Sequence, residues 1–278
     1  MTGSQNPGSK PVAFDVDRGR LSYHAPIQAT SLPMTLPARG RASLAAVIES
    51  ADKATTRWSI TSLDGGVGRS TVAAALASLL ASGTADVLLV DGSPSPWPAT
   101  LTQLDVPACP VSLALTHVRP WPEWIPRSSA GMHVLAGAAA GYPTISAWDL
   151  QRIPNLPGAT SFRHILVDWP AAITPPISLG ETILVARADT PSLERVVQLL
   201  NAGILDPAKT TLVVNLGTTI GDVDKRARSL RTTLEGRVSH VAQLRHDKAL
   251  TAAPYHPTRL AAATATALTE ILTKGIHR

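Results

Sequence analysis

Residues 58–71 of the chain read WSITSLDGGVGRST, and this stretch decides the fold. The apolar run at its start, Trp58–Leu63, predicts a buried strand, and the Ala- and Leu-rich segment Arg69–Leu80 predicts a helix. Glycines between a strand and a helix let successive backbone N–H groups turn toward an anion, and the helix dipole adds to that attraction. We therefore predict a phosphate-binding loop over residues 64–71. The alternative is a glycine-rich turn that binds no ligand.

The predicted nucleotide-binding residues of this loop share a backbone or hydroxyl group that can face the phosphates. They are Gly65, Gly66, Val67, Gly68, Arg69, Ser70 and Thr71. The Ser70 hydroxyl is expected to bind a Mg²⁺ ion that bridges two phosphate groups. Arg69 stands where a lysine usually reaches the terminal phosphates, so it is also a predicted catalytic residue.

Further apolar runs predict the rest of a sheet. They lie at Val87–Val90, Met132–Leu135, His164–Val167, Thr182–Ala186, Thr210–Val214 and Val241–Leu244. Helices are predicted at Pro191–Asn201, Val223–Leu234 and Arg259–Thr273. The strands are continuously apolar instead of alternating, which indicates that both of their faces are covered. The predicted fold is therefore a doubly wound α/β domain, a mostly parallel sheet with helices on both faces.

Polar residues follow three of these strands. Asp91, Asp168 and Asn215 each come directly after an apolar run. The carboxyl ends of parallel strands meet at one edge of a sheet, where ligands bind. We expect Asp91 and Asp168 to hold Mg²⁺ together with Ser70, and Asp91 to serve catalysis as well.

The segment before residue 56 has a different composition. Gly, Ser, Pro and polar residues dominate its start, and Pro26, Pro33 and Pro37 interrupt it. This predicts a flexible N-terminal arm over residues 1–55, with one short helix at Ser43–Ala51, followed by one domain over 56–278.

Composition restricts the cellular setting and the partners. The single cysteine, Cys109, and the lack of an apolar segment behind the first charges predict a cytoplasmic protein. The net charge of +5 permits non-specific contact with DNA. The basic residues of one predicted helix are candidates for it, although acidic residues nearby also suit a solvated helix face. These basic residues are Lys225, Arg226, Arg228, Arg231 and Arg237. We expect no membrane contact through the last helix.

The loop resembles the deviant Walker A motif of the ParA/MinD family, KGGxGK followed by Ser or Thr. Other stretches resemble that family in the same order: VLLVD at 87–91, MHVLAG at 132–137, ILVDWPAA at 165–172, VVNLG at 213–217 and AQLRHDKALTAA at 242–253. The resemblance implies binding of ATP or ADP with Mg²⁺, contact of Asn215 with adenine, and a homodimer that closes over nucleotide. Trp97 and Trp169 would then lie near the dimer interface.

The chain departs from the family pattern at three positions. The signature lysine, which reaches the phosphates of the partner subunit, is Asp64, and the Walker A lysine is Arg69. A second aspartate near the attacking water is replaced by Ser93. A carboxylate repels phosphate unless it faces away, and a guanidinium does not fit the role of an ammonium point charge. We therefore expect weakened or absent ATP hydrolysis. An active ATPase in which another basic residue compensates is the alternative.

Two functions follow from the resemblance. The first is a nucleotide-binding switch that positions or assembles a cellular partner, in plasmid or chromosome partition or in placement of a pilus, secretion or division machine. The second is a non-catalytic scaffold that resembles the ParA-like proteins localising Tad pili. The identity of the protein partner is left open by the sequence. A ligand-processing enzyme, such as an amide-forming synthetase, has no second substrate site in the sequence to support it.

Overall fold

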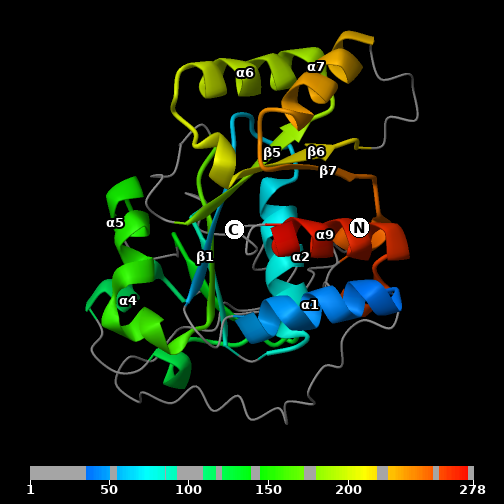
Figure 1. Cartoon of the computed structure of the whole chain (residues 1–278). Coiled ribbons are helices and arrows are strands. Elements are labelled where there is room, and N and C mark those ends of the chain that lie inside the picture. Colours follow the sequence, from blue (N-terminus) through cyan, green and yellow to red (C-terminus); the bar gives the residue numbers. More distant parts are fainter. Residues whose placement is uncertain are drawn as a thin grey trace, which may run out of the picture.

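The computed structural model describes residues 36–50, 55–84, 86–92, 109–116, 121–138, 145–171, 180–217, 225–252 and 257–274. Within them, seven strands form one sheet in the order β3-β2-β4-β1-β5-β6-β7 (Figure 1). The strands are β1 Thr56–Ser62, β2 Val87–Asp91, β3 His133–Ala136, β4 His164–Asp168, β5 Glu181–Arg187, β6 Thr210–Asn215 and β7 His240–Leu244. Every neighbouring pair is parallel, so the predicted parallel sheet is confirmed.

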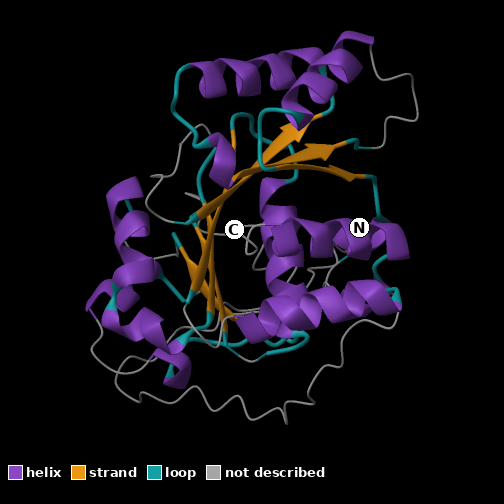
Figure 2. Cartoon of the chain, viewed as in Figure 1, coloured by secondary structure: helices purple, strands orange, loops and turns teal. Residues whose placement is uncertain are grey.

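Helices cover both faces of the sheet, as predicted (Figure 2). One face carries α1 Ala38–Ser50, α2 Arg69–Ala81, α8 Lys248–Thr251 and α9 Ala262–Lys274. The other face carries α4 Val111–Thr116, α5 Ala147–Arg152, α6 Thr190–Asn201 and α7 Lys225–Glu235. Short 3₁₀ turns lie at Trp121–Glu123, Ile153–Asn155, Pro157–Ser161, Pro207–Lys209 and Pro257–Arg259. The doubly wound α/β fold is therefore present in the described residues.

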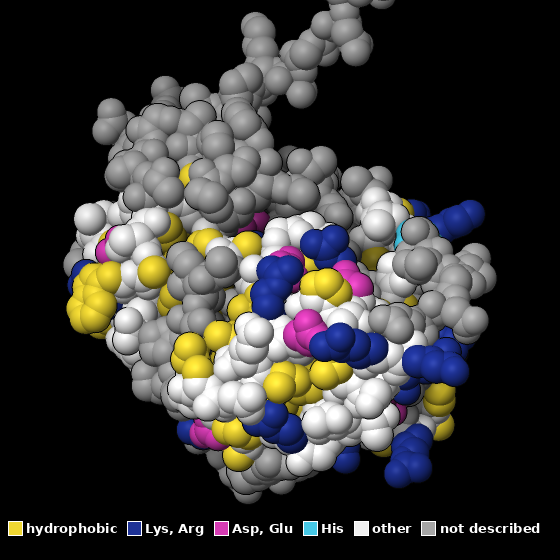
Figure 3. Space-filling model, turned by 90° about the horizontal axis from the view of Figure 1, so that it is seen from above, with side chains coloured by type: hydrophobic (Ala, Val, Ile, Leu, Met, Phe, Trp, Pro, Cys, Tyr) yellow, Lys and Arg dark blue, Asp and Glu magenta, His cyan; other side chains and the backbone are white. Residues whose placement is uncertain are grey.

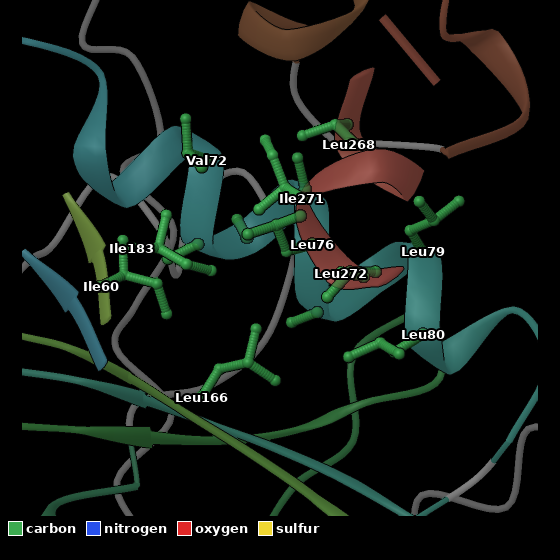
Figure 4. Close-up of a cluster of buried hydrophobic side chains, with 14 of the residues drawn as sticks. Ile60, Val72, Leu76, Leu79, Leu80, Leu166, Ile183, Leu268, Ile271 and Leu272 are labelled. Carbon is green, nitrogen blue, oxygen red and sulfur yellow. The ribbon is translucent and has the colours of Figure 1, made fainter. Parts of the chain in front are cut away.

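Helix α2 is the centre of the larger core. Every residue from Val72 to Ala81 is buried, because β1, β4 and β5 lie on one side of the helix and α9 on another (Figure 4). Leu76 packs between the sheet residue Ile60 and Ile271 of α9 in this cluster. A helix that is apolar all round is a buried helix, which explains the low polarity of this segment. Its packing fixes the start of α2 at the carboxyl edge of the sheet.

Two buried histidines lie in the sheet away from that edge. His164 Nδ1 lies 2.6 Å from the Thr56 hydroxyl, and its ring stacks on Trp58. His133 accepts a hydrogen bond at Nε2 from Arg127 and donates from Nδ1 to the Ile125 carbonyl. Burial lowers the pKa of each imidazole to about 4, so both are neutral at pH 7.

Residues 36–50, which were predicted to belong to a flexible arm, pack against the domain. The predicted helix at 43–51 is present, but it begins five residues earlier, at Ala38. Leu36, Leu44 and Val47 are almost fully buried in the same cluster as α2 and α9. The spacing of Leu44, Val47 and Ile48 places these side chains on one helix face, which packs against the domain. Residues 1–35 and 51–54 of the predicted arm lie outside the described residues.

Other boundaries differ little from the predictions. The last helix begins at Ala262 instead of Arg259, since Pro257–Arg259 forms a 3₁₀ turn. Helices α4 and α5 were not expected, because six residues are too few to show a helical period. In the described part of the chain, no helix has the length and apolar character needed to cross a membrane.

Candidate functional site

The loop between β1 and α2 has the backbone shape of an anion cradle. Gly66 and Gly68 have φ angles of +69° and +87°, which L side chains rarely adopt. A Cβ atom added to Gly65 or Gly66 would meet nothing within 4 Å, so the loop borders open space. No side chain caps the start of α2. Its first N–H groups therefore keep their capacity to bind an anion.

Asn215 at the end of β6 holds this loop in place. Its Nδ2 donates to the Val67 carbonyl at 2.8 Å, and its Oδ1 accepts from the Gly217 N–H at 3.0 Å. A Cβ atom on Gly68 would lie 2.7 Å from the same Nδ2, so only glycine fits there. An amide has a second donor hydrogen and a second acceptor lone pair. Asn215 can therefore support the loop and still contact a ligand.

Two pockets meet at the loop. The larger has a volume of about 450 Å³ and is lined by Ser62, Asp64, Gly65, Gly66, Gly68, Arg69, Ser70, Thr71, Pro170 and Ala171. The smaller has a volume of about 160 Å³ and is lined by Gly66, Gly68, Thr71, Val72, Asn215, Gly217, Leu244, Arg245, His246, Asp247, Leu250 and Thr251. They share Gly66, Gly68 and Thr71. The first is thus bordered by the glycine backbone of the loop, and the second adjoins it beside Asn215 and the segment after β7.

The segment that borders the second pocket is fixed by Asp247. This carboxylate accepts from the N–H of Ala249 at 2.9 Å and from the N–H of Ala261 at 2.9 Å. Asp247 thereby caps α8 and joins it to the approach to α9. The wall of the smaller pocket is consequently held by hydrogen bonds from backbone N–H groups to the Asp247 carboxylate, although it lies outside regular strands.

Asp64 is turned toward α6. Its carboxylate accepts from the Ser192 hydroxyl at 3.0 Å and forms an ion pair with the Arg195 guanidinium. Only 10% of the Asp64 side chain is exposed, whereas half of Arg195 is. The expected repulsion between Asp64 and phosphate is therefore reduced, because a cation neutralises the carboxylate.

Arg69 is bonded to two of the three side chains that were expected to organise Mg²⁺. Its Nε donates to Asp168 Oδ1, and its Nη2 donates to the Ser70 hydroxyl at 3.3 Å. Asp168 is completely buried and Arg69 is 12% exposed. Burial raises the pKa of the Asp168 carboxyl to about 7, although Arg69 beside it opposes that rise. The three side chains form one connected cluster at the start of α2.

Asp91 lies next to this cluster. It pairs in register with Asp168 on the neighbouring strand, and its charge helps to raise the Asp168 pKa. The prediction that Asp91 and Asp168 lie at the carboxyl ends of strands is confirmed, and the structure shows that these two strands are neighbours. The described residues nevertheless hold no group of three or more His, Cys, Asp or Glu side chains suited to a metal ion. Mg²⁺ in proteins usually retains several waters. In this arrangement Ser70 and Asp168 do not fit such a hydrated ion. Both side chains are bonded to Arg69, and Asp168 is in addition closed to solvent.

Comparison with known proteins supplies the family likeness. No protein-family model matches the chain, and no curated protein matches it either. Solved structures do match. MinD, a cell division ATPase of Pyrococcus furiosus, is 22% identical with a TM-score of 0.58, and the match covers 80% of this chain and 99% of that chain. The septum site-determining protein MinD of Pyrococcus horikoshii, complexed with Mg-ADP, is 19% identical with a TM-score of 0.57, covering 79% and 95%. A ParA family ATPase of Chlorobium tepidum is 17% identical with a TM-score of 0.54, covering 80% and 96%.

The chain has the ParA/MinD-type P-loop fold. Sequence identities this low establish the fold and leave the activity to be argued from the site. Of the positions where this ParA/MinD-like chain departs from the family motif, Asp64 and Arg69 have defined partners. Ser93 lies outside the described residues.

One of the two tryptophans expected near a dimer interface is buried in the ParA/MinD-like chain. Trp169 is buried in the core between the sheet and α5, so it does not form an interface surface. Trp97 lies outside the described residues. At least three of the five candidate basic residues are paired within the chain: Arg226 of α7 with Glu194 of α6, Arg231 of α7 with Glu235, and Arg237, which follows α7, with Asn201. Figure 3 shows basic and acidic side chains interspersed over the face that α6 and α7 form. This arrangement fits a solvated helix face better than a DNA-binding stripe.

Sequence reasoning missed Ser192 and Arg195. They lie on α6, far along the chain from the loop, and nothing in their local pattern marks them as partners of Asp64. The sequence did contain one signal for such partners. Asp64 places a carboxylate where a lysine is expected at a phosphate site, and a largely buried charge requires a counter-charge.

Proposed function

We propose that the chain is a nucleotide-binding switch that positions or assembles a cellular partner. The observation that carries this proposal is the pair of joined pockets at the loop, one bordered by glycine backbone and the other by Asn215 and the segment after β7. A phosphate chain and a nucleoside together match such a pair. Their combined size is in the range of small-molecule sites, roughly 300–1,000 Å³.

The ligand we propose is ATP or ADP. The N–H groups of the loop and of the start of α2 would bind the phosphate groups, with the Arg69 guanidinium beside them. Asn215 and the residues after β7 would border the base and ribose. The MinD of Pyrococcus horikoshii, with the same fold, was solved with Mg-ADP, which supports a nucleotide in this place.

The positioning role rests on the fold together with the site. The two Pyrococcus MinD proteins of this fold are a cell division ATPase and a septum site-determining protein. We propose the same kind of task here, with nucleotide controlling a monomer–dimer equilibrium and so the capture of a partner protein. A DNA partner has less support, because Arg226 and Arg231 of α7 and Arg237 just after it already have partners within the chain.

Slow or absent hydrolysis is part of the proposal. Efficient phosphoryl transfer depends on positive charges placed at the transferring group. Here the carboxylate at the signature-lysine position is bonded to α6, and the guanidinium at the Walker A position is bonded to Asp168. Both contacts also favour the scaffold hypothesis, in which nucleotide is not hydrolysed at all.

Turnover and oligomeric state test the proposal together. We expect the wild-type chain to bind ATP but to release phosphate at a rate barely above background. The double variant Asp64→Lys/Arg69→Lys should gain turnover if the loop has lost catalytic charges. Light scattering after gel filtration should show a larger species with ATP than without nucleotide. Rapid turnover by the wild type that Arg69→Ala abolishes would contradict the proposal of a weakened site.

A further inference from the structure

Two of the three residues expected to hold Mg²⁺, Asp168 and Ser70, are bonded to a cation of the protein. The Arg69 guanidinium donates from Nε to the Asp168 carboxylate and from Nη2 to the Ser70 hydroxyl. These are the carboxylate and the hydroxyl that a bridging Mg²⁺ would require. We propose that Arg69 takes the place of Mg²⁺, so that the loop binds the phosphate groups of a nucleotide without a divalent ion. This inference rests on the proposed nucleotide-binding function.

The burial of Asp168 and Arg69 leaves little room for a metal ion to bind beside them. The Asp168 side chain has no exposed surface and Arg69 is only 12% exposed. Mg²⁺ dehydrates reluctantly and usually keeps several waters, which need room beside the protein ligand. A metal ion on Asp168 would be a second cation directly beside the Arg69 guanidinium, on a carboxylate that has no exposed surface.

The geometry of a guanidinium allows Arg69 to serve the ligand without leaving Asp168. Arginine carries five N–H donors in a planar fork, whereas lysine has one ammonium group. One Arg69 donor is used by Asp168 and one by Ser70. The remaining donors belong to a residue that lines the larger pocket beside Gly65, Gly66 and Gly68. A phosphate in that pocket would therefore meet a fixed cation whose position is set by a buried anion.

Arginine at position 69, where the family motif has lysine, explains why this phosphate loop would differ from an ordinary Mg²⁺-dependent loop. An ammonium group offers a point charge and cannot hold a carboxylate, a hydroxyl and a phosphate in one plane. Arg69→Lys should therefore loosen the cluster, expose Ser70 and Asp168 to a metal ion, and make nucleotide binding depend on Mg²⁺.

Equilibrium titration with ATP tests the inference, carried out on the full chain once in excess MgCl₂ and once in EDTA. We expect the two dissociation constants of the wild type to agree within about twofold, and those of Arg69→Lys to differ by about tenfold or more in favour of Mg²⁺. Arg226→Lys, on the exposed surface of α7, is the matched control and should behave as the wild type. Thermal unfolding of each variant shows that it is folded.

The outcomes separate the two proposals. A wild-type affinity that falls tenfold or more in EDTA overturns the replacement of Mg²⁺ by Arg69 and leaves nucleotide binding in place. A lack of binding in both buffers overturns the nucleotide-binding function, and with it this inference. Should Arg69→Lys fail to fold, the comparison of the wild type in the two buffers still decides.

Discussion

The Asp64 carboxylate in the phosphate loop is paired with the Arg195 guanidinium of α6. This contact joins the loop to a helix that packs on the opposite face of the sheet from α2. It also makes an acidic residue tolerable at the mouth of a phosphate pocket, because the negative charge has a counter-charge. The pairing has consequences that can be measured.

Arg195→Ala should weaken nucleotide binding. Removing the guanidinium leaves the Asp64 charge uncompensated beside the pocket, and a loss on the order of tenfold in affinity, about 1.4 kcal/mol, is expected. Fluorescence titration with a labelled ATP analogue measures the change. Adding Asp64→Asn to the same chain should restore most of the affinity.

Arg226→Ala is the matched control for that prediction. Arg226 pairs with Glu194, the neighbour of Arg195 on α6, and lies outside the residues that line the pockets. Its removal should leave nucleotide affinity unchanged. Equal losses in Arg195→Ala and Arg226→Ala would mean that the general charge of the α6–α7 face matters, and not the pair with Asp64.

Gly68→Ala should damage the loop more than its backbone strain explains. A Cβ atom at this position would lie 2.7 Å from Asn215 Nδ2, and the φ angle of +87° is unfavourable for alanine. We expect a loss of about 2 kcal/mol in the free energy of unfolding and at least tenfold weaker nucleotide binding. Chemical denaturation and ligand titration measure the two effects.

Gly203→Ala separates strain from the clash. Gly203 follows α6 with a φ angle of +66°, and a Cβ atom there would meet nothing within 4 Å. Its replacement should cost about 1 kcal/mol of stability, from strain alone, with no change in nucleotide affinity. Similar affinities for Gly68→Ala and the wild type would show that the loop is not the binding site.

Stability should fall as the pH is lowered from about 6.5 to about 4. Burial lowers the pKa of His133 and His164 to about 4 in the folded chain, below the value near 6.5 of an unfolded histidine. At these two sites the unfolded state therefore binds more protons in this window, and each histidine withdraws up to about 3 kcal/mol of stability as the pH falls through it. Asp168, whose pKa burial raises to about 7 in the folded chain, offsets part of this loss because the folded state binds its proton first. Denaturant unfolding at several pH values measures the slope.

His164→Asn tests the source of that slope. The variant has one proton-binding group fewer, so its stability should change less steeply between pH 6.5 and pH 4, whatever its stability at pH 7. An unchanged slope would assign the acid sensitivity to other groups.

Leu44→Ala should destabilise the domain although the residue precedes the first strand. Leu44 is fully buried against the cluster that contains α2 and α9, so a loss of about 2–4 kcal/mol is expected. Arg39→Ala, on the exposed part of the same helix, should change stability by less than about 0.5 kcal/mol. Thermal or urea denaturation of both variants makes the comparison.

Much of this fold was predictable because its strands are covered on both faces. Continuous apolar runs marked all seven strands, and Asp91, Asp168 and Asn215 marked the edge at which they end. The loop was readable because glycines, a preceding strand and a following helix occur together only in a few structures. These features depend on local pattern, which a single sequence contains.

The unpredicted features depend on contacts between distant segments. The burial of α1 could not be predicted, because its apolar face is too narrow to distinguish it from a free helix before its partner α9 is known. The pairing of Asp64 with Arg195 joins residues 131 positions apart. The bond from Arg69 to Asp168 spans 99 positions. Tertiary packing determines such pairs, and the local spacing of residues in the sequence does not indicate them.

Nucleotide binding by this fold is tested most directly by a calorimetric titration of the full wild-type chain with ATP, repeated with ADP as competitor. We predict saturable binding at one site per chain with a dissociation constant below the millimolar range, and competition between the two nucleotides. A folded chain that shows neither heat of binding nor competition at millimolar nucleotide, with and without Mg²⁺, would rule out the nucleotide-binding function.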